Sequence, residues 1–166
     1  IMGAFGISVT TFVGQNFGAR KFDRIKRGVK VCFGLSVIAT VCISLFSVLC
    51  GGAIIRLFND DPGVLAVGEV IIKTVPPLFI TYNAIEIFSG AVRGCGDAVR
   101  PMLMTLCGVC ILRIIWIFAV VPLSPNIRTL ILSYPITWTV TSLAFFFYYL
   151  HGGWLKRRMR VNGMIP

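Results

Sequence analysis

Acidic side chains and histidine are scarce in this sequence of 166 residues. Asp and Glu together number six, and His151 is the single histidine. A metal site needs several such ligands that converge, and most hydrolytic chemistry needs a carboxylate pair or a nucleophile with its base. No set of residues with the spacing of either kind is apparent, so the sequence predicts a protein that is not an enzyme and that holds neither a metal nor an organic cofactor.

Charge of either sign is also sparse for a protein of this length. Charged residues make up 13% of the chain, hydrophobic residues make up 57%, and the mean hydropathy is +0.88. An ordinary soluble domain is about 25% charged, so this composition indicates an integral membrane protein. No basic leader precedes the first apolar run, which indicates that no signal peptide is present. We expect the chain to start inside a helix and to be a piece of a longer protein.

The net charge of +10 has an explanation other than nucleic-acid binding. The basic residues lie in short segments between apolar runs, and this is the distribution that a membrane imposes on loops. A nucleic-acid protein would instead gather them along one helix or patch. The lipid bilayer, and no nucleic acid, is therefore the predicted partner.

Five apolar runs are long enough, or nearly long enough, to cross a bilayer, which takes about 20 residues. They cover about residues 1–19, 31–55, 64–92, 102–121 and 129–150. The predicted fold is an all-α polytopic transmembrane bundle over residues 1–160, followed by a tail at 161–166.

The distribution of Lys and Arg orients these five crossings. The segments 20–30 and 93–100 and the C-terminal residues 151–166 would fall on one side and carry twelve basic residues, whereas the two opposite loops carry Arg56 and Arg128. Cytoplasmic loops carry the excess of Lys and Arg. The sequence therefore predicts that segments 20–30 and 93–100 and the tail are cytoplasmic.

The run 64–92 is unusual for a membrane helix because it contains a proline pair and several polar side chains. Pro76 and Pro77 remove two backbone donors and should break the helix. Glu86 is the only acid deep in an apolar run, and an ionisable group at that depth indicates a transport path or a relay by default. We therefore expect a broken, polar helix that lines a site.

Several side chains near the break are candidates for that site, each with a structural alternative. Glu86 could bind a coupling ion, or it could pair with Arg113, which would make both charges tolerable in the membrane. Arg113 could instead bind carbonyl groups freed by the prolines. Asn83, Tyr82 and Thr81 could coordinate an ion or line a cavity, or they could make hydrogen bonds between helices.

Three aromatic residues in the last two runs could contact an aromatic or cationic substrate by stacking. They are Tyr134, Trp138 and Trp116. Packing and interfacial anchoring are the commoner uses of such rings in membrane proteins, so both interpretations remain open.

Four motifs resemble those of one transporter family, in order and in spacing. They are Val13-Gly14-Gln15-Asn16-Phe17-Gly18-Ala19-Arg20, Arg93-Gly94-Cys95-Gly96-Asp97 with Pro101, Leu112-Arg113-Ile114-Ile115-Trp116, and Ser133-Tyr134-Pro135-Ile136-Thr137-Trp138. Together they resemble the second half of multidrug and toxic compound extrusion (MATE) transporters, and the last two are similar to Gram-positive bacterial members.

The resemblance implies a protein with twelve helices in two lobes of six, in a bacterial plasma (inner) membrane. It implies export of drugs or organic cations in exchange for sodium ions or protons. This chain would cover about the eighth to twelfth helices, so the N-terminal lobe would be its partner within the same transporter. Some members place a coupling carboxylate in the tenth helix, and Glu86 is the acid nearest that place. A lipid-linked oligosaccharide flippase of related fold and a non-transporting membrane scaffold are the alternatives.

Overall fold

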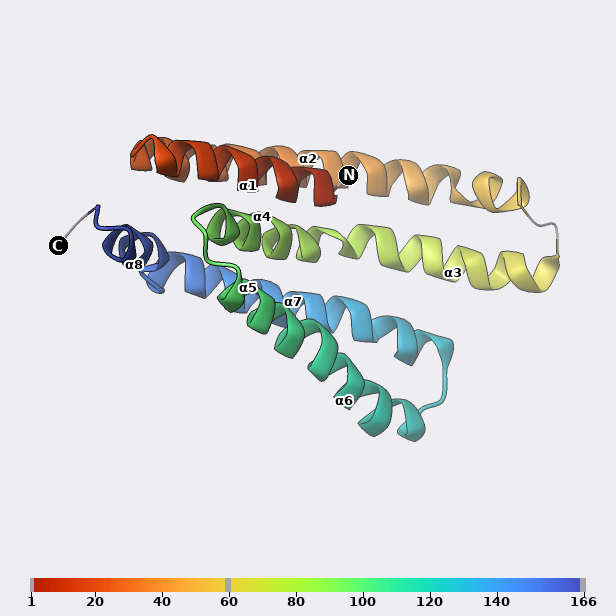
Figure 1. The fold of residues 1–166 in the computed structure, drawn as a ribbon. Coiled ribbons are helices and arrows are strands. Elements are labelled where there is room, and N and C mark those ends of the chain that lie inside the picture. Colours follow the sequence, from red (N-terminus) through yellow and green to blue (C-terminus); the bar gives the residue numbers. More distant parts are fainter. Residues whose placement is uncertain (1, 59–60, 165–166) are drawn as a thin grey trace.

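The computed structural model describes residues 2–58 and 61–164, and all the regular elements in this part of the chain are helical. The helices run back and forth along one direction (Figure 1). Their bounds are α1 Met2–Gly18, α2 Phe22–Arg56, α3 Pro62–Leu78, α4 Ile80–Gly94, α5 Val99–Thr105, η1 Leu106–Ile111, α6 Leu112–Ala119, η2 Val121–Leu123, α7 Ile127–His151 and α8 Trp154–Val161. The predicted all-α helical bundle is confirmed.

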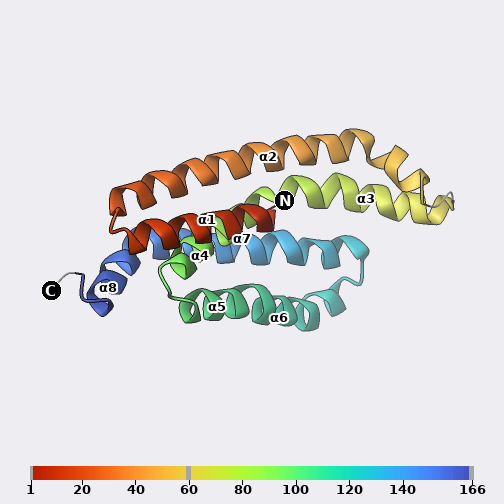
Figure 2. The same cartoon turned by 45° about the horizontal axis from the view of Figure 1, so that its top comes forward.

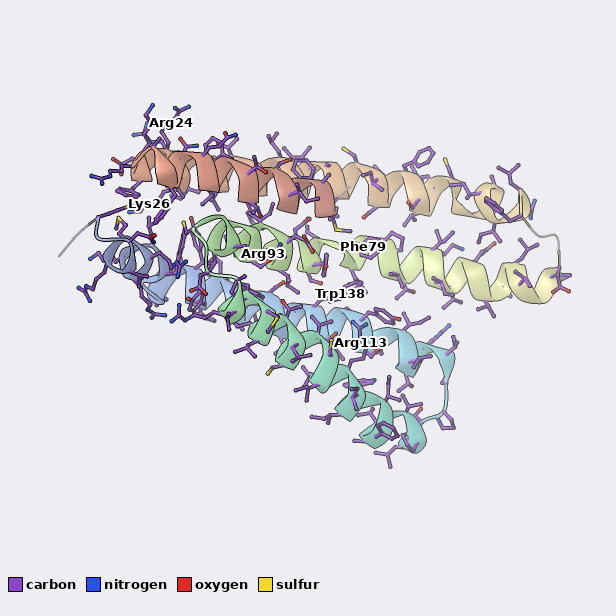
Figure 3. The ribbon with its side chains drawn as sticks, viewed as in Figure 1. Arg24, Lys26, Phe79, Arg93, Arg113 and Trp138 are labelled. Atoms are coloured by element: carbon purple, nitrogen blue, oxygen red, sulfur yellow. The ribbon has the colours of Figure 1, made fainter. Side chains whose placement is uncertain are left out.

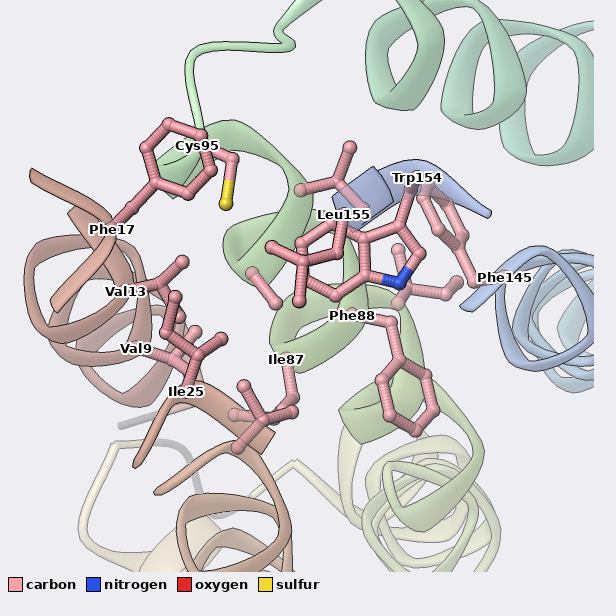
Figure 4. Close-up of a cluster of buried hydrophobic side chains, with 14 of the residues drawn as sticks. Val9, Val13, Phe17, Ile25, Ile87, Phe88, Cys95, Phe145, Trp154 and Leu155 are labelled. Atoms are coloured by element: carbon pink, nitrogen blue, oxygen red, sulfur yellow. The ribbon is translucent and has the colours of Figure 1, made fainter. Parts of the chain in front are cut away.

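Helix α4 lies at the centre of the bundle. It packs against α1 and α2 on one side and against α7 on the other, and the turned view shows α5 and α6 outside α7 (Figure 2). The buried apolar cluster is gathered near one end of α4 and includes Val9, Val13, Ile87, Phe88 and Trp154, as the close-up shows (Figure 4). The position of α4 makes its side chains the natural candidates for contacts between helices.

Four of the five expected crossings are found among the described residues. Helix α2, the segment Val99–Leu123 and helix α7 are each long and apolar enough to span a membrane, and α3 with α4 can count as one broken span. The described part of α1 has 17 residues, somewhat fewer than the roughly 20 that a crossing requires. The fifth crossing therefore stays a prediction.

The predicted break at the proline pair is confirmed. Helices α3 and α4 meet at an angle of 45°, directly after Pro76 and Pro77. Because both prolines lack a backbone N–H group, the helical hydrogen-bond ladder cannot continue through them. Phe79, at the junction, donates its N–H to the Pro76 carbonyl at 3.1 Å in a tighter turn.

Side chains from both neighbouring helices bind backbone carbonyl groups at the break. Ser44 of α2 donates its hydroxyl to the Pro76 carbonyl at 2.6 Å, and Ser142 of α7 donates to the Thr81 carbonyl. In lipid, carbonyl groups at a break need such partners. The break is therefore held in place from α2 and from α7.

We expect Ser44→Ala to lower the stability of the full-length protein by about 1 kcal/mol, because one hydrogen bond across helices is lost at the Pro76 carbonyl. Thermal unfolding in detergent measures the change. Ser47→Ala is the matched control, since Ser47 makes no side-chain hydrogen bond within the described part of the chain. Equal melting temperatures for the two variants would show that the Ser44 bond does not stabilise the break.

Three local features differ from the sequence prediction. Residues 20–30 form neither a loop nor a separate short helix at the membrane face, because α2 runs without interruption over 35 residues from Phe22 to Arg56 and leaves only a short turn after α1. The segment around residues 102–121 contains a π-helical stretch, Leu106–Ile111. Its Gly108 lies so close to α7 that a Cβ atom there would be 2.2 Å from the Thr141 hydroxyl oxygen.

The third difference is a helix, α8, in the tail. Its Trp154 and Leu155 are buried, whereas its basic residues Lys156 and Arg157 are exposed. The Arg158 guanidinium donates to the carbonyls of Cys95 and Gly96 in the turn after α4, so α8 is docked to that turn. Burial raises the pKa of the Cys95 thiol to about 12, although Arg158 opposes the shift, and the thiol stays protonated at neutral pH.

The turn after α4 is tight, as its glycines predict. Gly96 has a φ of +84°, a backbone conformation that favours glycine. Asp97 then forms an ion pair with Arg100. This turn, the turn after α1 and helix α8 all gather at the same end of the bundle (Figure 1), so the basic segments predicted to share one side do lie together.

Candidate functional site

The site begins with a close contact between α1 and α4 that glycines allow. A Cβ atom at Gly94 would lie 2.6 Å from the Thr10 carbonyl, and one at Gly90 would lie 2.8 Å from the Gly6 carbonyl. Thr10 donates its hydroxyl to the carbonyls of Gly6 (2.8 Å) and Gly90 (3.1 Å). Small residues let membrane helices approach until their backbones touch, and here they bring α1 against the polar face of α4.

Glu86 lies on that face of α4, at the contact with α1. The Tyr82 hydroxyl, one turn earlier, donates to its Oε1 at 2.6 Å. Its Oε2 lies over Gly6, because a Cβ atom at Gly6 would be 2.4 Å from it. The carboxylate is half-buried and is held between a tyrosine of its own helix and the backbone of α1.

A hollow of about 470 Å³ opens beside this carboxylate between α1 and α4. Its lining residues combine a carboxylate, a guanidinium and two hydroxyls with two small or apolar residues. They are Gly3, Ile7, Thr10, Thr11, Glu86 and Arg93.

Arg93 stands two turns along α4 from Glu86 and lines the same hollow. Seven residues of helix separate the two Cα atoms by roughly 10 Å along the axis, and Figure 3 shows Arg93 near the end of α4. The ion pairs found between described residues are Lys73–Glu69 and Arg100–Asp97, so neither Glu86 nor Arg93 is in one.

This arrangement can hold a small cation. Carboxylate and hydroxyl oxygens are the ligands that hard cations prefer, and Glu86 with Thr10 and Thr11 supplies three such groups around one hollow. The Glu86 carboxylate is half-buried, and among the described side chains the Tyr82 hydroxyl donates to it. Among the described residues no group of three or more metal-binding side chains is found.

Asn83 does not face this hollow. It is 1% exposed and its amide nitrogen donates to the Thr40 hydroxyl of α2 at 2.9 Å. Thr81 is likewise engaged at the break, where its hydroxyl donates to the Leu78 carbonyl at 2.7 Å. Of the two interpretations of these residues, hydrogen bonding within and between helices is the one that the structure shows.

The expected ion pair between Glu86 and Arg113 is absent from the described contacts. Arg113 donates from Nη2 to the Thr137 hydroxyl at 3.2 Å, and its guanidinium carbon lies 4.0 Å from the centroid of the Tyr134 ring. Both partners are on α7, which separates Arg113 from Glu86. Nor does Arg113 bind the break, where serines bind the Pro76 and Thr81 carbonyls.

The three aromatic candidates have different environments. Trp138 is 8% exposed and packs against Phe79 and Tyr82 with ring centroids 5.5 and 5.4 Å apart, so within the described part of the chain it is a core residue. Trp116 donates its indole N–H to the Thr129 carbonyl at 3.0 Å. Tyr134 is 40% exposed but has Arg113 over its ring.

Sequence reasoning missed the α1 side of the site and Arg93. The signal was present: Gly3, Ile7 and Thr10 are spaced by four and three residues, which places them on one face of a helix. Arg93 follows Glu86 by seven residues, again on one face. What the sequence could not give was which helix this face would meet.

Comparison with known proteins agrees with this architecture. The model of the MatE family matches residues 1–119. A probable multidrug resistance protein, NorM, from Thermotoga maritima is 32% identical to the chain over 107 residues. That match covers 63% of this chain and 23% of the relative, so the chain spans a minor part of the relative's length. Since the family model matches more than half of the sequence, the chain belongs to the MATE (multidrug and toxic compound extrusion) family of membrane proteins.

Proposed function

We propose that this chain is part of a secondary active multidrug efflux transporter and that Glu86 is its coupling carboxylate. The observation that carries the proposal is the placement of Glu86. The only acid deep in a span opens into a polar hollow between α1 and α4, and it forms no ion pair among the described residues. The transporter would export drugs or organic cations in exchange for sodium ions or protons.

Exchange requires that ion and drug favour different conformations of the protein. Glu86 can change its charge by binding a proton or a sodium ion, with Thr10 and Thr11 as further oxygen ligands. Neutralising Glu86 changes its bond with Tyr82, and Tyr82 contacts the buried Trp138 of α7. The 45° break lies one to two turns before Glu86, and broken helices carry the sites of many secondary transporters.

Arg93 adds a positive charge to the lining of the hollow. A guanidinium that lines the hollow raises the cost of placing a cation there, and it attracts the Glu86 carboxylate when no ion is bound. We propose that Glu86 and Arg93 together set the affinity for the coupling ion, and that the drug binds in the cavity completed by the N-terminal lobe.

A lipid-linked oligosaccharide flippase is less well supported. Its anionic substrate would need several cations along a cavity, whereas Lys73 is exposed and paired with Glu69 at 2.8 Å and Arg113 is engaged by α7. A non-transporting scaffold does not require a carboxylate that opens into a polar hollow, so it does not explain the placement of Glu86.

Transport by the full-length protein tests the proposal. In proteoliposomes, an imposed sodium or proton gradient should drive uptake of a fluorescent organic cation such as ethidium. Comparing the two gradients identifies the coupling ion. Uptake no faster than in protein-free vesicles under either gradient would contradict the proposed activity.

The proposed orientation places the basic end of the bundle in the cytoplasm of a bacterium, at its plasma membrane. In the full-length protein with its native cysteines replaced, a cysteine introduced at Arg24 should escape a membrane-impermeant maleimide in intact cells, and one introduced at Asp61 should react. Both should react in inverted vesicles or lysed cells, which controls for access. Labelling at position 24 but not at position 61 in intact cells would reverse the orientation.

A further inference from the structure

A groove lies between the start of α2 and the end of the chain, at the basic end of the bundle and away from Glu86. It has a volume of about 400 Å³. Its lining combines three lysines with a mostly apolar and aromatic surface and contains no acidic residue. The lining residues are Phe22, Lys26, Lys30, Tyr149, Leu150, Gly153, Trp154, Leu155, Lys156 and Met159.

The three lysines come from two helices that face each other across this groove. Phe22, Lys26 and Lys30 are spaced by four residues and therefore share one face of α2, while Lys156 belongs to α8. All three lysines are exposed, and Figure 3 shows Lys26 on the side of α2 that faces α8. The two ion pairs of the described residues involve other side chains, so these ammonium groups are not neutralised by them.

The floor of the groove is fixed by packing. Trp154 is 4% exposed, donates its indole N–H to the Tyr149 carbonyl at 3.0 Å, and lies with its ring centroid 5.2 Å from that of Tyr149. The packed rings of Trp154 and Tyr149 therefore give the groove a fixed aromatic floor.

Aromatic packing continues from this floor toward the middle of the bundle. Tyr149 stacks on Phe88 of α4 with centroids 4.8 Å apart. Phe88 stacks on Phe33 of α2 at 5.4 Å and contacts Phe146 of α7 at 6.0 Å. Phe33 follows Lys30 by one turn of α2, so an apolar track runs directly inward from the lysines.

We propose that this groove binds an anionic phospholipid, with its phosphate between Lys26, Lys30 and Lys156 and an acyl chain against the accessible rings of Phe33 and Phe146, which flank the buried Phe88. Charge complementarity supports this occupant, because basic pockets between membrane helices bind anionic headgroups. An inorganic anion would use the lysines but not the apolar track. A zwitterionic lipid could place its acyl chain against the same aromatic side chains. Its headgroup carries no net charge, so the three lysines, which have no acidic residue beside them in the groove, would attract it less strongly.

Native mass spectrometry of the detergent-solubilised full-length protein tests this assignment, with dioleoyl phosphatidylglycerol and dioleoyl phosphatidylcholine as the probes. The triple variant Lys26→Gln, Lys30→Gln, Lys156→Gln should retain phosphatidylglycerol with affinity lower by about tenfold or more, since each lysine near an anionic headgroup contributes about a factor of five. Phosphatidylcholine retention should change little. Excess inorganic phosphate should not displace the lipid.

The matched control removes the same charge from the same end of the bundle but outside the groove. It is the triple variant Arg20→Gln, Lys21→Gln, Arg157→Gln, whose residues do not line the groove. It should lose less than about threefold in phosphatidylglycerol affinity, because only the diffuse surface charge changes. Equal losses in both variants, no loss in the first, or displacement by phosphate alone would each overturn the proposal. Melting temperatures of both variants verify that they are folded.

Discussion

We expect Glu86→Gln to abolish drug resistance in cells that depend on the full-length protein, with expression near that of the wild type. Glutamine keeps the size of the side chain and can still accept the hydrogen bond from Tyr82 (2.6 Å in the wild type), so the fold should persist. It cannot exchange a proton, and it binds a cation far less well than a carboxylate does. Minimum inhibitory concentrations should fall to those of cells with an empty vector, and quantitative immunoblotting measures expression.

Glu69→Gln is the matched control for this variant. Glu69 is the other glutamate of the broken span, and it is exposed and paired with Lys73 across one helical turn. Such an exposed pair contributes little to stability because solvent screens it, so resistance should be unchanged. Loss of resistance in both variants would indicate a general sensitivity of the span, and unchanged resistance in Glu86→Gln would leave Glu86 with a structural role at most.

Gly94→Ala should destabilise the protein strongly, although alanine is the better helix former. A Cβ atom at position 94 would lie 2.6 Å from the Thr10 carbonyl and 2.8 Å from the Val13 Cβ. Both are atoms that cannot move without shifting α1, and forcing atoms into such a contact costs about 1–3 kcal/mol. We expect a lower melting temperature in detergent and reduced transport, because the hollow at Glu86 is formed by the same contact.

Gly18→Ala provides the comparison for this prediction. A Cβ atom at Gly18 meets nothing within 4 Å, and alanine is favoured over glycine in a helix by up to about 1 kcal/mol. This variant should be as stable as the wild type or slightly more stable. Equal effects of the two substitutions would mean that the approach of α1 to α4 is not as close as described.

Local chemistry made several features predictable from the sequence. Pro76 and Pro77 lack the backbone N–H groups that a helix needs, and the break lies directly after them. The basic segments gather at one end because each pair of apolar runs returns the chain to the same side.

Contacts between helices could not be predicted in the same way. Arg113 and Glu86 lie in neighbouring runs and carry opposite charges, so pairing them was reasonable, but α7 supplies Thr137 and Tyr134 as partners instead. The rotation of α4 also decides that Asn83 faces α2 while Glu86 faces α1, although three residues separate them. The π-helical stretch Leu106–Ile111 left no clear mark in the sequence, and neither did the close approach of its Gly108 to Thr141 of α7.

Drug-driven ion movement measures coupling at Glu86 most directly. Full-length wild-type protein, Glu86→Gln and Glu69→Gln are reconstituted in proteoliposomes, and an outward drug gradient is imposed without any ion gradient. Uptake of sodium ions or protons is then followed with isotope or a pH-sensitive dye. We predict ion uptake in the wild type and in Glu69→Gln, and none above protein-free vesicles in Glu86→Gln. Equal drug-driven ion uptake in Glu86→Gln and the wild type would contradict the assignment of Glu86 as the coupling carboxylate.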